Sequence, residues 1–243
     1  MRPAPSPHNN TLAKKSQQRK IAGLVNGCRQ IRVKRNKENK IIVGTWNVRT
    51  LLYPGKMQEL AERISETQLE ILAIQEIRWC GTGLIKKQNY SLYYSGSTSK
   101  TRQAGTGFIF PKKMQNYVIG FEPYNECLCK LRIKGKYNNI TQINVCTPTE
   151  DHTEETKEQF YDNLQYLLDK TPKSDTIVFL GDVNAQLGKD RLYNEVTGQH
   201  NLHEETNRNG ELLCEFAYAN NMVVMSTNFQ HKRIHKITWL SPD

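Results

Sequence analysis

The chain has 243 residues, which allows one large α/β domain or two small ones with a sizeable core. Hydrophobic residues make up 37% of it and its mean hydropathy is -0.68; no apolar run reaches membrane-spanning length, and the N-terminus lacks the apolar core of a signal peptide. The net charge of +10 lies entirely in residues 1–40, because the remainder holds equal numbers of acids and bases. We therefore expect an intracellular protein without a membrane partner.

Residues 1–40 predict a basic arm that precedes the folded domain. The segment begins Pro-rich and contains eleven Lys or Arg residues and one acid, with too few apolar residues to build a core, so we expect disorder. Such an arm could bind nucleic acid, act as a nuclear import signal, resemble a mitochondrial presequence or only keep the chain in solution. We expect a nuclear location, and a single folded domain over residues 41–243.

The folded part is expected to open with a strand, a helix and a second strand. An apolar β-branched strand begins at 41–43 and runs to Asn47. A helix is predicted over 56–66, where apolar residues repeat at the spacing of one helical face. A second buried strand follows at 71–74, directly before Gln75 and Glu76.

The rest of the chain predicts mixed α and β structure with many consecutive strands. Strands are expected at 90–94, 106–110, 117–121, 127–133 and 140–145, with a hairpin at Asn138-Asn139. A helix over 154–168, a buried strand over 177–180, a long polar loop over 185–207, a helix around 212–217 and a strand over 222–225 follow. This order predicts an α/β (α+β) fold with two packed mixed β-sheets and helices outside them.

Three predicted strands end in short polar side chains: Asn47 after the first, Glu76 after the second, and Asp182 with Asn184 after the third. If the strands are neighbours, these groups meet in one pocket whose oxygen ligands suit Mg²⁺, or Mn²⁺ in its place. Asp182 could then orient or deprotonate a water, and Asn184 could donate to a phosphoryl oxygen. That set suits metal-assisted phosphodiester hydrolysis. Three unrelated strand-end turns are the alternative.

Charge is unevenly placed within the body of the chain. Residues 78–136 hold eleven bases against two acids, and residues 150–215 hold fifteen acids against six bases. If the two segments pack against each other, one face is cationic and suits the phosphate backbone of DNA. An ordinary solvated surface is the alternative.

Three motifs resemble the endonuclease/exonuclease/phosphatase superfamily: T-W-N-V-R-T at 45–50, I-Q-E-I-R-W at 74–79 and G-D-V-N at 181–184. The likeness continues with T-P-T-E at 147–150, N-R-N-G-E-L-L at 207–213 and K-I-T-W-L-S-P-D at 236–243. Taken together, these motifs resemble the apurinic-type endonuclease domain of non-LTR (LINE-type) retrotransposons and their cellular derivatives.

The resemblance implies a four-layer α/β sandwich that nicks DNA with Mg²⁺, in an element whose downstream domain is a reverse transcriptase. By position, Glu76 would bind the metal together with Asn47 and Asp182, and Asp182 would orient the attacking water. Asn184 would stabilise the phosphorane-like transition state. The resemblance also gives Arg78 and Asn209 as substrate-binding residues.

The chain departs from the family pattern in three places. Cys146 stands where many relatives have a tyrosine, and Arg49 where some have an acid. The family's last strands, with an Asp-His pair, would follow Asp243, so we expect a domain whose last strands are missing; His231 and His235 precede the final motif and cannot replace that histidine. The alternative function is therefore a truncated, catalytically inactive nuclease-like protein that at most binds nucleic acid. A phosphoinositide, sphingolipid or small phosphoester substrate is a further hypothesis, disfavoured by the T-W-L-S-P-D ending.

Overall fold

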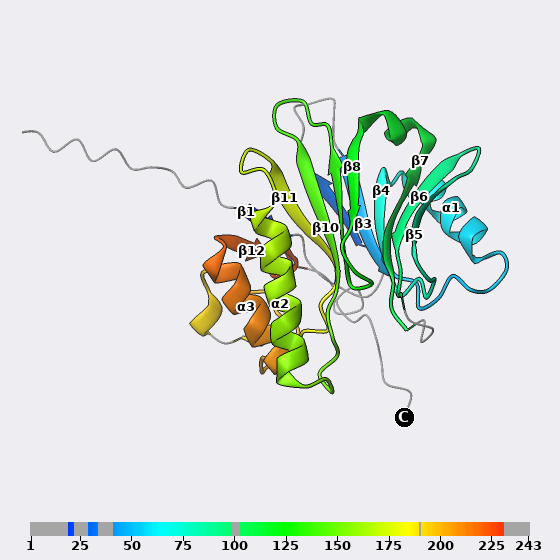
Figure 1. The fold of residues 1–243 in the computed structure, drawn as a ribbon. Coiled ribbons are helices and arrows are strands. Elements are labelled where there is room, and N and C mark those ends of the chain that lie inside the picture. The colour runs from blue at the N-terminus through cyan, green and yellow to red at the C-terminus, as the bar shows by residue number, and fades with distance from the viewer. Residues whose placement is uncertain (1–18, 22–28, 34–40, 99–102, 190, 231–243) are drawn as a thin grey trace, which may run out of the picture.

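Two β-sheets pack face to face, with helices on their outer faces (Figure 1). The structure, a computed structural model, describes residues 19–21, 29–33, 41–98, 103–189 and 191–230. The prediction of two packed mixed sheets with helices outside is confirmed. No helix in these residues is long and apolar enough to cross a membrane.

The larger sheet has six strands in the order β2-β3-β4-β7-β6-β5. Strands β3 and β4 run parallel, with helix α1 between them in the chain, and the other pairs are antiparallel. The bounds are β2 Arg29–Val33, β3 Ile41–Asn47, α1 Lys56–Thr67, β4 Ile71–Gln75, β5 Thr82–Lys86, β6 Tyr90–Ser95 and β7 Thr106–Pro111.

The smaller sheet has four strands in the order β11-β10-β9-β8. Strands β10 and β11 run parallel and are connected through helix α2, whereas β8, β9 and β10 form an antiparallel meander. The bounds are β8 Val118–Pro123, β9 Leu128–Ile133, β10 Ile140–Cys146, α2 Glu154–Asp169 and β11 Thr176–Asp182.

A pair of short parallel strands and helix α3 complete the fold beside the smaller sheet. In the described residues, three short 3-10 helices lie in connections, one of them inside the predicted long polar loop. The bounds are β1 Arg19–Ile21, η1 Lys112–Tyr117, η2 Arg191–Tyr193, α3 Arg208–Ala219, β12 Met222–Val224 and η3 Met225–Thr227.

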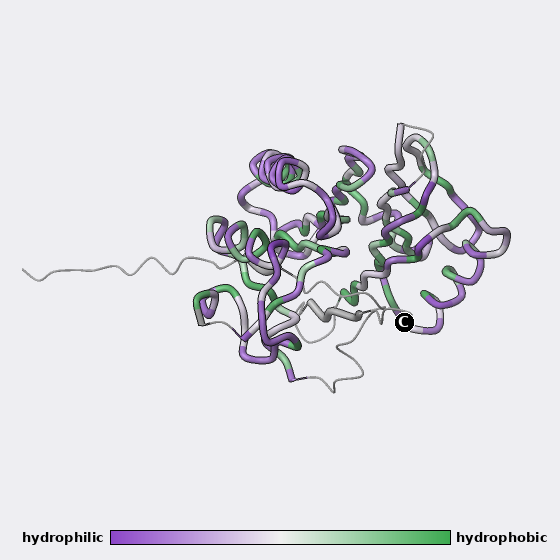
Figure 2. The backbone as a smooth tube through the Cα atoms, turned by 90° about the horizontal axis from the view of Figure 1, so that it is seen from below, coloured by the Kyte–Doolittle hydropathy of each residue, from purple (hydrophilic) through white to green (hydrophobic). Residues whose placement is uncertain are grey.

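The alternation of side chains along the strands produces four layers. In β11, Val178 and Leu180 face the other sheet, whereas Ile177 and Phe179 face α2 and α3. In β4, Ala73 faces the other sheet, and its neighbours Leu72 and Ile74 pack with α1. Because successive residues of a strand point to opposite faces, apolar runs such as these are buried on both sides. Seen from below, α1 and α2 lie on opposite sides of the strands (Figure 2).

Residues 1–40 are predicted to be a disordered arm, whereas the structure describes two strands within them, β1 and β2. Strand β2 pairs antiparallel with β3 from Arg29↔Thr45 to Val33↔Ile41. Without that partner, one backbone edge of β3 would carry unpaired N–H and C=O groups, and the alternation of Ile31 and Val33 with polar residues is a strand pattern. The other residues of 1–40 lie outside the described ranges, and strand β5, which has no clear alternation, was not predicted at all.

Candidate active site

The polar groups at three strand ends form one hydrogen-bonded cluster. Asn47 ends β3, Glu76 directly follows β4, and Asp182 ends β11 of the facing sheet. The Asn47 side-chain amide Nδ2 donates to Glu76 Oε1 at 2.7 Å and to Asp182 Oδ2 at 3.0 Å. The structure therefore brings together three of the residues that the sequence selects, at the lower end of the strands in Figure 1.

The backbone at these strand ends is strained. Glu76, Arg78 and Asn184 have φ values of 54°, 63° and 46°, in the left-handed region that residues other than glycine seldom adopt. Arg49, two residues after Asn47, has φ 60°. Such residues cost about 1–3 kcal/mol each and cluster at functional sites, because the surrounding structure must hold them in place.

Gly181 allows β11 to approach β10 closely just before Asp182. Its φ is 140°, and a Cβ atom there would lie 1.9 Å from the carbonyl oxygen of Val145. The parallel register then places Asp182 beside Cys146, and Thr147 N donates to the Asp182 carbonyl at 2.8 Å. Only glycine fits at this position, so the position of Asp182 depends on Gly181.

Burial makes the Asp182 carboxylate more basic than usual. Asp182 is only 7% exposed. Desolvation raises its pKa, the hydrogen bonds from Asn47 and from the backbone N–H of Asn184 lower it, and the negative charge of Glu76 raises it again, with an upward net shift. A buried carboxylate of raised pKa is suited to accept a proton from water.

The backbone of Asn184 is held in place by the buried Asn209. The Asn184 Nδ2 donates to the Thr147 carbonyl at 2.7 Å, and the Asn209 Nδ2 donates to the carbonyl oxygens of Pro148 at 3.0 Å and Asn184 at 3.1 Å. Asn209 is 0% exposed, so it lies beneath the site. The contact of Asn209 with substrate stays a prediction. The hydrogen bonds that the structure shows from Asn209 support the backbone of Pro148 and Asn184.

The N-terminus of α3 is fixed to the T-P-T-E segment through Glu150. One Glu150 oxygen accepts from Asn207 Nδ2 at 2.9 Å and from the Asn209 backbone N–H at 3.3 Å, and the other accepts from the buried Lys157 at 3.4 Å. The Asn207 side chain also caps the helix by accepting from Gly210 N. This segment therefore positions Asn209.

A buried polar network joins the two sheets immediately behind the cluster. Gln75 Nε2 donates to Asn144 Oδ1 at 2.7 Å and to Thr45 Oγ1 at 3.1 Å. Asn144 Nδ2 in turn donates to the carbonyl oxygens of Ile74 and Gly107. The sequence analysis did not single out Asn144; it lies on the predicted strand at 140–145 together with the polar Thr141 and Gln142, so it carried no distinctive signal.

Cys146 lies beside the cluster. Its backbone N–H donates to the carbonyl oxygen of Cys127, just before β9, at 2.9 Å, and its register partner on β11 is Asp182. Burial raises its pKa well above the ordinary value, and the nearby Cys127, Asp182 and Glu76 raise it further. The thiol is therefore protonated and acts as a small apolar group where many relatives are expected to carry a tyrosine.

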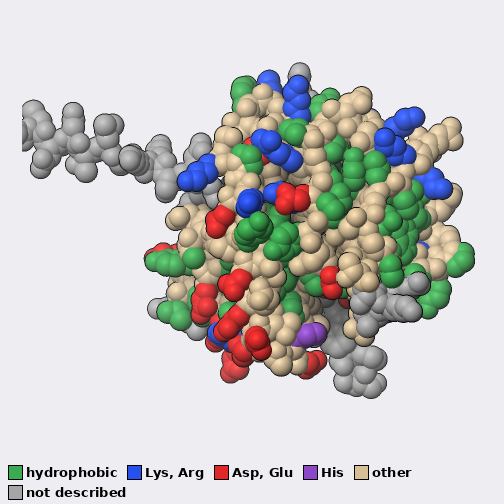
Figure 3. Space-filling model, in the orientation of Figure 1, with side chains coloured by type: hydrophobic (Ala, Val, Ile, Leu, Met, Phe, Trp, Pro, Cys, Tyr) green, Lys and Arg blue, Asp and Glu red, His purple; other side chains and the backbone are tan. Residues whose placement is uncertain are grey.

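Most of the bases that the structure describes in the predicted cationic face lie away from the site. Gln75 at the site end of β4 pairs with Thr106 at the start of β7, whereas Pro111 is at the far end of β7. Among the residues that the structure describes, the exposed bases of the 78–136 segment lie at or near the far ends of strands: Lys86, Lys87, Lys112, Lys113, Lys134 and Lys136. Figure 3 shows bases gathered in the upper part of the molecule and acids at the lower left, over α2 and α3. Charge counts along the sequence do not reveal which strand end a loop occupies.

Among the described residues, two arginines do lie at the site. Arg78 Nη2 donates to Glu76 Oε2 at 3.1 Å, and the backbone N–H of the exposed Arg49 donates to Asn47 Oδ1 at 3.0 Å. His231, His235 and the motif at 236–243 lie outside the described residues.

The donor set fits Mg²⁺ better than a softer metal. In the part of the chain that the structure describes, no group of three or more His, Cys, Asp and Glu side chains could hold a metal. The cluster offers instead two carboxylates, Glu76 and Asp182, and the amide of Asn47. Mg²⁺ commonly binds one or two carboxylates and completes its shell with water and substrate phosphates.

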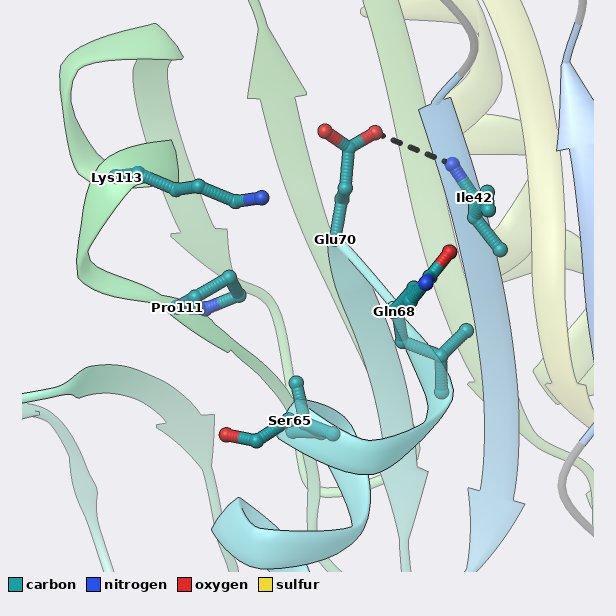
Figure 4. Close-up of a pocket in the computed structure, with 8 residues that line it drawn as sticks. Ile42, Ser65, Gln68, Glu70, Pro111 and Lys113 are labelled. Atoms are coloured by element: carbon teal, nitrogen blue, oxygen red, sulfur yellow. Dashed lines mark hydrogen bonds between the residues drawn. The ribbon is translucent and has the colours of Figure 1, made fainter.

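A separate pocket lies at the opposite ends of the strands. Ile42 at the start of β3 and Glu70 just before β4 line it, and the Ile42 N–H donates to Glu70 at 3.2 Å (Figure 4). Lys113 extends into the same pocket from η1. The length of the strands separates this pocket from Asp182, so it is not the candidate active site.

Comparison with known proteins places this arrangement in a family. A family model described as "Endonuclease/Exonuclease/phosphatase family" matches residues 44–231. The chain belongs to this family. The match includes the cluster of Asn47, Glu76 and Asp182, so the candidate site lies within the family domain.

Two curated relatives carry the name craniofacial development protein 2. That of Tragulus javanicus is 36% identical over 201 residues, which are 83% of this chain and 34% of the relative. That of Bos taurus is 35% identical over 201 residues, which are 83% of this chain and 33% of the relative. The chain thus spans about a third of the length of the curated relatives it matches.

Two solved structures are similar to this chain at low sequence identity. The AP endonuclease LMAP from Leishmania major is 11% identical with a TM-score of 0.53, covering 81% of this chain and 72% of its own. The endonuclease domain of TRAS1, a telomere-specific non-LTR retrotransposon, is 15% identical with a TM-score of 0.46, covering 73% of this chain and 70% of its own.

Proposed function

We propose that this domain is a Mg²⁺-dependent phosphodiesterase that nicks DNA. The observation that carries the proposal is the meeting of Asn47, Glu76 and Asp182 in one cluster from two facing sheets. Hydrolytic nucleases and phosphatases are usual in the family to which the chain belongs. Mg²⁺ or Mn²⁺ would be held by Glu76 and Asp182 with the help of Asn47, and would supply charge stabilisation at the phosphate.

In this proposal the chain's own residues divide the remaining work. Asp182 orients the attacking water and accepts its proton, which its raised pKa favours. Asn184 donates to a phosphoryl oxygen as negative charge develops there; a side-chain amide has two N–H groups, and Thr147 accepts from one of them. Asn209 holds Asn184 in place by donating to its carbonyl oxygen.

DNA is the proposed substrate because of the family motifs and the two arginines at the site. Arg49 is exposed beside Asn47, and Arg78 is bonded to Glu76, so both are placed to meet a phosphate. We further propose that the domain is of the non-LTR retrotransposon type, acts in the nucleus and works with a downstream reverse transcriptase. The retrotransposon type and the reverse transcriptase rest on the six sequence motifs between 45–50 and 236–243 taken together, and the nuclear location rests on the basic segment 1–40.

The test is conversion of supercoiled plasmid to nicked circles in the presence of Mg²⁺. We expect the wild type to nick and Asp182→Ala to be at least about 100-fold slower, the usual cost of losing a general base. Glu70→Gln is the matched control, since it also removes the charge of a carboxylate. Glu70 follows α1 and lies at the far end of the strands from Asp182. Identical time courses of plasmid nicking for wild type and Asp182→Ala would contradict the proposal.

Two other assays separate the alternatives. Hydrolysis of a small aryl phosphodiester without plasmid nicking would keep the hydrolase and remove DNA as substrate. Filter binding to DNA that weakens with salt, without any hydrolysis, would instead favour the inactive nucleic-acid-binding protein.

A further inference from the structure

Both oxygens of the Glu76 carboxylate accept a hydrogen bond from a neighbouring side chain. Its Oε1 accepts from the Asn47 amide at 2.7 Å, and its Oε2 accepts from the Arg78 guanidinium at 3.1 Å. A divalent cation that binds Glu76 must therefore compete with a positive charge that the chain itself supplies.

The Arg78 side chain is directed at Glu76 by an unusual backbone. Residues 76 and 78 are both in the left-handed region, on either side of the buried Ile77. The Ile77 and Arg78 N–H groups donate to the carbonyl oxygens of Gly105 and Ala104, at 3.1 and 2.9 Å. The turn is thus anchored to the segment before β7, so the contact between Arg78 and Glu76 is a built feature of the fold.

The surroundings favour a cation at this position. Glu76 and Asp182 both accept from the same amide, so two carboxylates lie close together. In the described structure, the guanidinium of Arg78 forms an ion pair with Glu76. Its side chain remains 43% exposed, which leaves it room to move, and its Nε is buried without a hydrogen-bond partner among the described residues.

We propose that Arg78 is an exchangeable counterion of Glu76, an inference that rests on the proposed function. Without metal the guanidinium neutralises Glu76 and limits its repulsion of Asp182. With a divalent cation held at Glu76, Arg78 would be released to meet the DNA phosphate, where its planar fork can make two parallel hydrogen bonds. Arg78 is in this account a positioning residue that links metal binding to substrate binding.

The experiment is a titration of the full chain with Mn²⁺, a paramagnetic substitute for Mg²⁺, followed by electron paramagnetic resonance without DNA. We expect Arg78→Met to bind Mn²⁺ about 3- to 10-fold more tightly than wild type, because a competing cation of modest strength is gone. Arg78→Lys, which keeps the charge, should remain within about twofold of wild type. The Arg78→Met variant should also bind a DNA duplex more weakly in the presence of the metal.

Arg49→Met is the matched control for charge alone, because Arg49 lies at the same site and is exposed. Equal tightening in Arg49→Met and Arg78→Met, or no tightening in Arg78→Met, would overturn the inference. Should Arg78→Met fail to fold, an Arg78→Lys affinity several-fold away from wild type would overturn it equally.

Failure of the proposed function has a different signature. If wild type binds no Mn²⁺, or if Glu76→Gln binds it as tightly as wild type, the metal site itself is wrong and the inference falls with it. If Glu76→Gln loses Mn²⁺ and Arg78→Met matches wild type, only the role of Arg78 is wrong.

Discussion

Asn47 and Asp182 are 135 positions apart in the chain and are joined by a 3.0 Å hydrogen bond from Nδ2 to Oδ2. Asn47 ends a strand of the larger sheet and Asp182 ends a strand of the smaller one. The bond therefore spans the interface between the sheets at the point where the proposed chemistry takes place. Changes that shift one sheet relative to the other should alter activity even where they touch no substrate.

Substitution of Asn209 should reduce turnover without changing substrate affinity. Asn209→Ala removes the donor to the carbonyl oxygens of Pro148 and Asn184. We expect kcat to fall about 10- to 100-fold, as for other residues that orient an active-site group, with little change in KM. Steady-state plasmid nicking measures both. Asn116→Ala, at an exposed asparagine of η1, is the control, and a rise in KM alone would contradict the supporting role.

Gly181 should not tolerate a side chain. In Gly181→Ala the new Cβ would meet the Val145 carbonyl oxygen at 1.9 Å, with φ at 140°. We expect a loss of about 3 kcal/mol or more in the free energy of unfolding, from strain and overpacking together. Urea denaturation measures it. Gly120→Ala has nothing within 4 Å of the new Cβ and should cost far less; equal losses would refute this account.

The ion pair of Arg132 and Asp175 should stabilise the smaller sheet in a pH-dependent way. Arg132 Nε and Nη2 donate to Asp175 at 2.6 and 2.9 Å, and the Asp175 side chain is 0% exposed. Arg132→Met leaves a buried carboxylate without its main partner, so we expect a loss of about 2–4 kcal/mol at pH 7.

The pH dependence follows from the pKa of Asp175, which the Arg132 hydrogen bond lowers below its ordinary 3.8. The stabilisation is present above that unfolded value and is lost as pH falls through the lower folded value. The gap in thermal midpoint between wild type and Arg132→Met should therefore narrow below about pH 4. Arg63→Met, which breaks an exposed pair with Glu66, should cost under about 0.5 kcal/mol. A gap that widens in acid would show that the pair is not the cause.

The described cysteines should differ sharply in reactivity. Burial raises the pKa of Cys127, Cys129 and Cys214 to about 12 each, whereas Cys80 is exposed. Because the thiolate is the nucleophile, Cys80 should be alkylated by iodoacetamide at pH 8 at least about 10-fold faster than the other three. Mass spectrometry of peptides from the native protein gives the rates, and the difference should vanish in urea. Fast alkylation of native Cys129 would contradict its burial.

Local sequence predicted the parts of the site that depend on strand ends. The apolar run at 177–180 is bounded by Gly181 and Asp182, and parallel strands bring their carboxyl ends to the same edge of a sheet. What could not be predicted depends on contacts between distant segments. The contact of Gln75 with Asn144 requires the facing of two sheets, and the location of Lys112 depends on the direction of β7. The pairing of β2 likewise depends on the edge of β3 that β4 does not occupy.

The most direct test of the central claim is the rate of plasmid nicking by an Asn47→Ala/Asp182→Ala double variant, measured beside the two single variants. Residues that act as one unit lose nearly all of their effect when either is removed. We therefore predict that the double variant nicks within about threefold of the slower single variant. A double-variant loss equal to the product of the two single losses would show that Asn47 and Asp182 act independently, and would contradict the account.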